Sequence, residues 1–231
     1  VFFRLAKGFV FYSAFATTEF RKHHPKYAKV PVHTIHLYPY TFTRHFSQQK
    51  PVQPEHVLFF GRLSYYKGID ILINGLTEFF TAYPNEKVVI AGKPAWGYEV
   101  DLKPLGPFAS NVTLVTRFLT TEELVNWIER SKFIVCPYRE ATQSGVLMTS
   151  FALGKPVVAT NVGSFPEYIQ EGKNGLLCEP EPSAVAQAMM QAIDHNRYET
   201  LARGVEIEQF SPVIRENRAT LLAAYTQIGQ C

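Results

Sequence analysis

The chain has 231 residues, of which 46% are hydrophobic and 19% are charged. This ordinary globular balance excludes a disordered tail, a coiled coil and a collagen-like fibre, and the length cannot hold two full domains of about 150 residues each. The net charge of +3 is too small to indicate nucleic-acid binding.

The cysteines lie far apart and show neither the spacing of a metal site nor that of a disulfide framework: Cys136, Cys178 and Cys231. Their arrangement favours a reducing compartment, so we expect a cytoplasmic protein. No apolar run approaches the roughly 20 residues that span a bilayer, and the start lacks a signal-peptide pattern. Because the chain begins with Val1 rather than Met, we interpret it as a fragment, a trimmed chain or the product of an incomplete reading frame.

The small net charge hides a basic first segment. Residues 1–45 hold seven Lys and Arg residues against one acid, Glu19, so this segment carries +6 and the remainder −3. The pattern fits a solvated basic face. It fits equally a surface that attracts an anionic partner, such as a lipid-phosphate acceptor at a membrane surface or an acidic partner domain.

The two ends of the chain differ from its middle. Residues 8–12 are a strand candidate, and a helix is expected between there and residue 22. Residues 48–54 contain two prolines and resemble a linker. Residues 212–227 predict a final helix with apolar side chains toward one side: Ile214, Leu221, Leu222, Tyr225 and Ile228.

In the middle, short apolar runs alternate with helical patterns. Strands are predicted at residues 57–60, 88–91, 112–115, 133–136 and 156–159. Helices are predicted from Ile69 to Phe80, after Thr120 or Thr121, and from Val146 to Leu153. Continuous apolar strands separated by helices indicate a parallel sheet that is covered on both faces. We therefore predict an α/β, Rossmann-like domain over residues 46–210.

The loop after the first strand of this domain carries a candidate phosphate site. Gly61 allows a sharp turn and the close approach of a ligand. Arg62 offers a planar fork of donors suited to phosphate. Lys67, expected at the start of a helix, adds a compact positive charge to that of the helix terminus. The alternative is that Arg62 and Lys67 are ordinary solvent-exposed residues of a surface loop.

A second candidate lies where residues 138–145 lead into an apolar helix. Small polar residues before such a helix leave its first N–H groups aimed at a ligand, and an anion fits there. Ser144 is equally suited to be the N-cap of that helix, and Thr142 and Gln143 to be turn residues.

Taken together, these segments resemble the donor-binding C-terminal domain of GT-B glycosyltransferases, family 4 of the retaining, nucleotide-sugar-dependent enzymes. The resemblance begins with Gly61-Arg62 and Lys67-Gly68. It continues in family order over about residues 55–195, through residues 90–92, 137–138, 141–145, 152–159, 162–167 and 174–177.

The resemblance implies that Arg62 and Lys67 hold the donor diphosphate and neutralise the charge on the leaving nucleotide. The N–H groups of Ser144, Gly145 and Val146 add to this. It implies no metal, and the sequence has no Asp-x-Asp triplet. The donor substrate is a nucleoside-diphosphate sugar, and no other cofactor is implied.

The sugar and the base are assigned in the same way. Arg117 and Phe118 match the loop that borders the nucleotide base. Glu140, Thr142 and Gln143 lie where the family contacts the donor sugar, and Glu140 is the candidate carboxylate on that side.

The sequence departs from the family pattern at a pair of glutamates that often flank seven residues. The first would fall at Ala141 or Thr142 here, with Glu140 as a near neighbour. The second, which lies on the helix and binds the nucleotide ribose, is Thr149 here. A hydroxyl has a single oxygen and cannot accept hydrogen bonds on two separate oxygens as a carboxylate does, so the ribose contact differs.

The resemblance also implies a domain organisation. Residues 1–45 match the tail of the N-terminal acceptor domain, residues 46–210 the nucleotide-sugar-binding domain, and residues 211–231 a helix that crosses back. We thus expect a hexosyltransferase-type enzyme of polysaccharide biosynthesis, acting on a glycan or lipid-linked glycan. The isolated chain is expected to transfer sugar poorly, and to pair with an acceptor domain or self-associate.

Three other functions remain open at this point. The chain could bind a sugar nucleotide without catalysis, as a module or subunit. It could be a GT-B sugar-nucleotide epimerase, although five of its seven histidines lie outside the donor domain. A dehydrogenase is disfavoured because no Gly-x-Gly-x-x-Gly follows the first strand.

Overall fold

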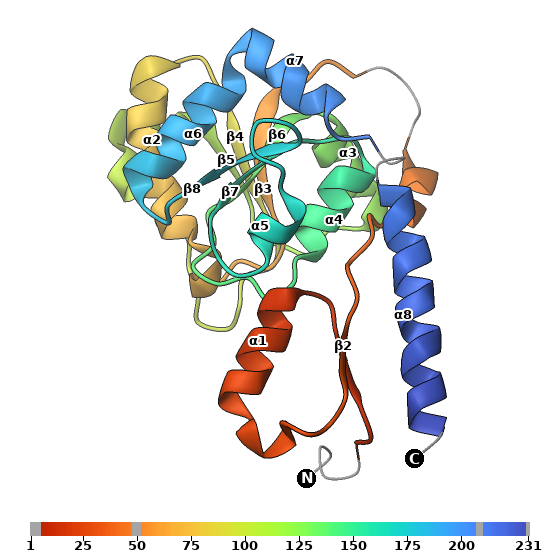
Figure 1. Cartoon of the computed structure of the whole chain (residues 1–231). Coiled ribbons are helices and arrows are strands. Elements are labelled where there is room, and N and C mark those ends of the chain that lie inside the picture. The colour runs from red at the N-terminus through yellow and green to blue at the C-terminus, as the bar shows by residue number, and fades with distance from the viewer. Residues whose placement is uncertain (1–5, 48–51, 207–209, 230–231) are drawn as a thin grey trace. The chain divides into compact units, whose positions relative to one another are not determined.

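A computed structural model of the chain describes residues 6–47, 52–206 and 210–229 (Figure 1). The chain divides into two compact units, here called unit 1 (residues 1–38 and 207–231) and unit 2 (residues 39–206). The first boundary between these two units follows Tyr38. Residues Thr41–Phe46, which form the 3-10 helix η3, belong to unit 2.

Unit 2 is built on a six-stranded parallel sheet with the order β5-β4-β3-β6-β7-β8. The strands are β3 (His56–Phe60), β4 (Val88–Ala91), β5 (Val112–Val115), β6 (Ser131–Cys136), β7 (Val157–Thr160) and β8 (Gly175–Cys178). The order runs outward from β3 in one direction and from β6 in the other. The carboxyl ends of β3 and β6 thus mark the topological switch point, near which such sheets bind ligands.

Helices cover both faces of this sheet, which explains why its strands are continuous apolar runs. In Figure 1, α2 and α6 lie side by side on one face, and α3 and α4 lie on the other. The α-helices of unit 2 are α2 (Ile69–Ala82), α3 (Thr121–Glu129), α4 (Gly145–Ala152), α5 (Phe165–Tyr168), α6 (Pro182–Ile193) and α7 (His195–Arg203). The 3-10 helices η4 (Tyr65–Lys67) and η5 (Lys103–Asn111) complete the unit.

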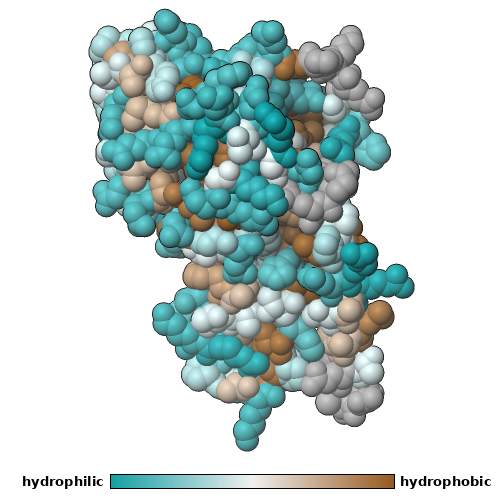
Figure 2. Space-filling model, turned by 45° about the horizontal axis from the view of Figure 1, so that its top comes forward, coloured by the Kyte–Doolittle hydropathy of each residue, from teal (hydrophilic) through white to brown (hydrophobic). Residues whose placement is uncertain are grey.

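The core of unit 2 is aromatic and aliphatic. Its largest fully buried side chains include Phe59, Phe79, Phe80, Phe133, Phe151 and Phe165. The face of unit 2 that Figure 2 presents is mostly hydrophilic, as expected when apolar side chains are gathered between sheet and helices.

Unit 1 contains a parallel strand pair, β1 (Phe9–Phe11) and β2 (Val32–Thr34), with α1 (Ala14–His23), η2 (Pro25–Tyr27) and α8 (Ser211–Gly229). The rings of Phe9, Phe11, Phe20 and Tyr27 pack together between these elements. Asn217 of α8 exchanges two hydrogen bonds with the backbone of His36, at 2.9 and 2.6 Å, and so fixes α8 to the segment after β2.

The predicted fold class is confirmed. β4 and β5 occupy the predicted residues, β7 begins one residue later, and α4 begins one residue earlier. β2, β8, α6 and α7 were not predicted. Of the predicted linker, residues 48–51 lie outside the described residues, and residues 52–54 form no helix or strand. Among the helices that the structure describes, none is both long and apolar enough to cross a bilayer.

Candidate active site

The candidate site is centred on Gly61, directly after β3. Gly61 has φ +114°, a conformation that other residues rarely adopt. A Cβ atom added there would lie 3.2 Å from Lys67 Nζ and 3.2 Å from Val146 Cγ2. The structure therefore brings together three of the predicted residues: Gly61 after β3, Lys67 of η4 and Val146 in the first turn of α4.

Lys67 is a buried cation at this point. Only 7% of the residue is exposed. Its Nζ atom donates a hydrogen bond to Tyr138 Oη at 2.7 Å and lies 4.4 Å from the centre of that ring. No carboxylate pairs with it among the described residues. A buried charge without a counterion is costly, so the site is suited to an anionic ligand.

The ionisation of the neighbouring groups leaves this cation without a negative partner. Burial lowers the pKa of the Lys67 ammonium below its usual 10.5. Burial also raises the pKa of the Tyr138 phenol well above 10 and that of the Cys136 thiol to about 12. Tyr138 and Cys136 are therefore neutral near pH 7.

One expectation about Lys67 was wrong. Lys67 is not at the start of an α-helix but ends η4, and Gly68 with φ +63° separates it from α2. A Cβ atom on Gly68 would lie 1.8 Å from the carbonyl oxygen of Pro137, so the loops after β3 and β6 touch here. A tight turn, rather than the first turn of an α-helix, thus positions the charge of Lys67.

Arg139 ties the same two loops together, and the sequence analysis gave it no role. Its guanidinium binds both carboxylate oxygens of Asp70, at 2.8 and 2.6 Å, and lies 4.1 Å from the Tyr65 ring centre. Its backbone N–H donates to the carbonyl of Tyr66 at 2.8 Å. An arginine three residues after β6 and an aspartate in the first turn of α2 were the available signal.

A pocket of about 450 Å³ opens beside Gly61, outside the carboxyl ends of β3, β4 and β5. This volume lies within the usual range of about 300–1,000 Å³ for ligand pockets. Arg62, Lys93, Arg117 and Phe118 line it together with apolar residues, and no Asp or Glu is among the lining residues. The pocket therefore brings the predicted phosphate ligand Arg62 together with the predicted base-binding residues, whereas Lys67 and the first turn of α4 do not line it.

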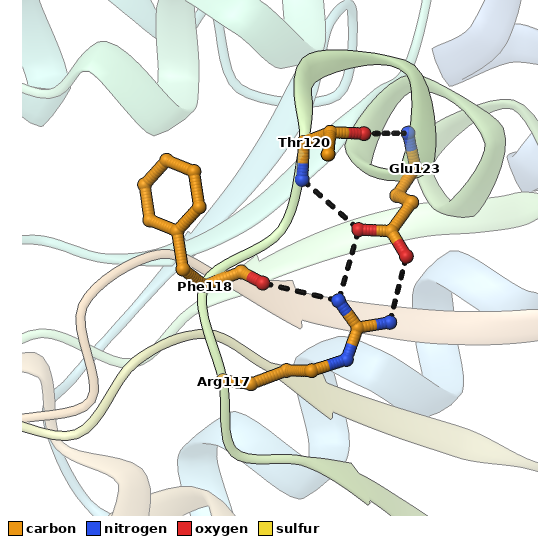
Figure 3. A network of polar contacts seen from close by, with 4 residues as sticks. All are labelled: Arg117, Phe118, Thr120 and Glu123. Atoms are coloured by element: carbon orange, nitrogen blue, oxygen red, sulfur yellow. Dashed lines mark hydrogen bonds and ion pairs between the residues drawn. The ribbon is translucent and has the colours of Figure 1, made fainter.

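The Arg117 side chain is already engaged (Figure 3). Its guanidinium donates to both oxygens of Glu123, at 2.9 and 2.7 Å, and to the carbonyl of Phe118 at 3.0 Å. Thr120 and Glu123 form the capping box that begins α3. The hydrogen bonds from Arg117 lower the pKa of Glu123 to about 2. Arg117 thus shapes the loop that presents Phe118, whose surface is 77% exposed.

At the start of α4, Ser144 is the N-cap. Its buried Oγ accepts a hydrogen bond from the N–H of Leu147 at 3.2 Å. The first N–H groups of a helix have no partner within the helix, so Gly145 and Val146 present donors here. A Cβ atom on Gly145 would lie 3.4 Å from the Tyr40 ring, a neighbour that the sequence did not predict.

Thr149 directs its proton into its own helix. Its Oγ1 donates to the carbonyl of Gly145 at 2.8 Å, and the residue is buried. A ribose contact at this position would therefore use Thr149 as an acceptor.

The predicted sugar-side residues lie on the loop between β6 and α4. Glu140, Thr142 and Gln143 are exposed, whereas Ala141 between them is buried. The carbonyl of Ala141 accepts a hydrogen bond from the N–H of Ser164 at 2.7 Å, which holds this loop against the one after β7. Among the described residues, Glu140 forms no ion pair.

Comparison with known proteins identifies the class of protein that this fold and site represent. Residues 54–195 match the family model described as glycosyl transferases group 1. The match covers more than half of the chain, and the chain belongs to this family. Its Rossmann-like unit 2 has the fold of the C-terminal domain of GT-B glycosyltransferases.

Curated relatives are longer than this chain. D-inositol 3-phosphate glycosyltransferase from Acidothermus cellulolyticus is 27% identical over 164 residues, which cover 67% of this chain and 37% of the relative. Glycogen synthase from Mycobacterium tuberculosis is 28% identical over 152 residues, which cover 64% and 36%. The chain thus aligns with only about a third of the length of these relatives.

Solved structures extend the likeness to nearly the whole chain. The Anabaena protein Alr3699/HepE, in complex with UDP and glucose, has a TM-score of 0.73 at 20% identity, covering 96% of this chain and 64% of that one. Sucrose-phosphate synthase from Thermosynechococcus elongatus has a TM-score of 0.67 at 21% identity, covering 95% and 59%. At these identities the likeness establishes the fold alone.

Proposed function

We propose that unit 2 binds a nucleoside-diphosphate sugar and that the protein transfers this sugar, with retention of configuration, to a glycan or lipid-linked glycan. The observation that carries the proposal is the Lys67 ammonium, which is buried beside Gly61, donates to the neutral Tyr138 phenol and, among the described residues, pairs with no carboxylate. The similar fold of a protein solved with UDP and glucose supports the choice of donor.

In this proposal, catalysis is mainly electrostatic. Negative charge grows on the departing diphosphate as the bond to the sugar breaks. Arg62 and Lys67 stabilise that charge, and the N–H groups of Ser144, Gly145 and Val146 add their partial positive charges. Because Lys67 is buried, its charge acts through a medium of low dielectric constant and is more effective than in water.

The remaining predicted residues position the donor. Phe118 and Arg117 border the base in the pocket beside Gly61, and Thr149 accepts a hydrogen bond from the ribose. Glu140, Thr142 and Gln143 contact the sugar, with Glu140 as the carboxylate on that side. The two cations take the role that a divalent metal has in other glycosyltransferases.

Calorimetry on the 231-residue chain with UDP-, GDP-, ADP- and TDP-sugars tests donor binding. Replacing both Arg62 and Lys67 by Ala removes two charge-assisted contacts, which should cost about 3 kcal/mol or more, a loss of about a hundredfold in affinity. Lys87→Ala is the matched control, because Lys87 is an exposed lysine that precedes β4, at the amino-terminal end of the strands and away from the site.

Two results would contradict the proposal. If the double variant folds and binds the donor as the unaltered chain does, the phosphate site is misplaced. If the donor is bound but neither hydrolysed nor transferred even when the acceptor domain and acceptor glycans are supplied together, the chain is a non-catalytic binding module. Where transfer occurs, the anomeric configuration of the product, read by NMR, tests retention.

A further inference from the structure

Beyond the ends of β3 and β4, the two backbone segments that follow these strands continue side by side. The strands pair up to Phe60 and Ala91, and a parallel bridge joins Leu63 to Pro94 three residues later. The N–H of Leu63 donates to the carbonyl of Lys93 at 3.0 Å. Arg62 and Lys93 therefore occupy matching positions on neighbouring backbones.

Gly92 makes this close approach feasible. It has φ +150°, and a Cβ atom there would lie 1.8 Å from the carbonyl oxygen of Gly61. The N–H of Ala95 then donates to the carbonyl of Leu63 at 2.7 Å. On the other side of Lys93, the N–H of Gly61 donates to the carbonyl of Ala91 at 3.0 Å. These hydrogen bonds fix the backbone of Lys93 beside that of Arg62.

The two side chains form an uncompensated pair of positive charges. Both residues are exposed and both line the pocket beside Gly61, which has no acidic lining residue. Within the described part of the chain, neither forms an ion pair, whereas Arg117 in the same pocket is neutralised by Glu123. Like charges on adjacent strands repel each other, and an anion bound between them removes that repulsion.

We propose that Lys93 is a further donor-binding residue and that Arg62 and Lys93 together hold the diphosphate of the nucleotide sugar. This inference rests on the function proposed above. The family resemblance gives Lys93 no role, so the assignment comes from the register and the charges alone. An arginine fork and a lysine point charge are complementary ways of binding adjacent phosphate oxygens.

Binding of UDP and of inorganic pyrophosphate to the 231-residue chain tests the inference. Lys93→Gln should weaken both ligands about tenfold, the size expected for one exposed charge-assisted hydrogen bond. Lys93→Arg keeps the charge and should bind within a few-fold of the unaltered chain. Lys87→Gln, at the other end of β4, should bind as the unaltered chain does, and circular dichroism confirms folding of each variant.

The outcomes separate this inference from the proposed function. If the unaltered chain binds UDP and Lys93→Gln binds it equally well, Lys93 is an ordinary loop lysine and the inference fails alone. If Lys93→Gln weakens UDP but not pyrophosphate, the assignment to the diphosphate is overturned. If the unaltered chain binds no nucleoside diphosphate at all, the proposed function and the inference fail together.

Discussion

The Lys67 ammonium and the Tyr138 hydroxyl form a buried hydrogen bond of 2.7 Å that joins the loops after β3 and β6. The phenol stays neutral near pH 7 because burial raises its pKa. It therefore solvates the lysine charge without cancelling it. A bound diphosphate would offer Lys67 a charged acceptor in its place.

Tyr138→Phe should destabilise the unliganded chain more than the liganded one. Without the hydroxyl, the buried ammonium loses its hydrogen-bond acceptor, which costs about 1–3 kcal/mol. A diphosphate restores an acceptor, so UDP should raise the melting temperature of the variant by more than it raises that of the unaltered chain. Tyr198→Phe in α7 is the control. Equal UDP-induced shifts in variant and unaltered chain would contradict this role.

Donor affinity should fall as the pH rises through the pKa of Lys67. Burial places this pKa below 10.5, so the loss begins at a lower pH than for an exposed lysine. Lys67→Arg should bind the donor with little pH dependence in this range, because arginine stays charged. The ionisation of the ligand cancels in the comparison. Parallel profiles for both proteins, measured by calorimetry, would exclude Lys67 as the titrating group.

The same lowered pKa of Lys67 affects folding stability in the opposite direction from donor affinity. Unfolded Lys67 keeps its proton to a higher pH than folded Lys67 does. Its contribution to the free energy of unfolding of the unliganded chain therefore increases with pH between the two pKa values.

Much of the fold was predictable because local patterns and tertiary burial agree. The run that became β4 is bounded by the breakers Gly92 and Pro94. The runs of β4 and β5 contain residues that favour strands, with the exceptions of Ala91 and Leu114. β8 was missed because Gly175 begins it and its run is short. Gly175 is there because a Cβ atom would lie 2.3 Å from the Val157 carbonyl oxygen, a contact that local sequence does not reveal.

The candidate site was predictable as a set of loops but not as a set of contacts. Residue types after each strand pointed to Arg62 and Lys67. That Lys67 is buried against Tyr138, and that Glu123 engages Arg117, depends on how the loops fold onto each other. Such pairings join residues from different strands and leave no periodic signal in the chain.

Glu123→Gln should loosen the loop that presents Phe118. The substitution keeps the shape of the side chain but removes the charge that binds Arg117. We expect UDP to bind a few-fold more weakly, while pyrophosphate, which has no base, binds as before. Glu122→Gln, one residue away in the same helical turn, is the control. Tighter UDP binding would instead show that Glu123 restrains Arg117 from the ligand.

The Glu123 contact also predicts acid sensitivity. The pKa of Glu123 is lowered from 4.5 to about 2. The stabilisation by Arg117 is therefore complete above about pH 4.5 and is lost as the pH falls toward 2. UDP binding by the unaltered chain should therefore weaken as the pH falls from about 4.5 toward 2. Binding by Glu123→Gln should lack this part of the pH dependence.

Donor binding should not depend on a divalent metal. Arg62 and Lys67 supply the positive charge that the diphosphate needs, and among the described residues no group of three His, Cys, Asp or Glu side chains is placed to hold a metal ion. Adding EDTA should leave the UDP affinity unchanged in calorimetry. A loss of affinity that Mg²⁺ or Mn²⁺ restores would refute this prediction.

Gly92→Ala should disrupt the pocket, whereas Gly97→Ala should leave it intact. Both glycines have positive φ, +150° and +71°, which other residues rarely adopt, so each substitution carries a backbone penalty of about 1–3 kcal/mol. Only at Gly92 would the new methyl group also meet backbone, 1.8 Å from the Gly61 carbonyl oxygen. At Gly97 nothing lies within 4 Å. Relieving that collision must separate the loops after β3 and β4, which moves Lys93 away from Arg62. We therefore expect Gly92→Ala to lower the free energy of unfolding in urea by more than Gly97→Ala does. Only Gly92→Ala should lose UDP binding. If both variants bind UDP equally, close contact between these loops is not needed to form the site.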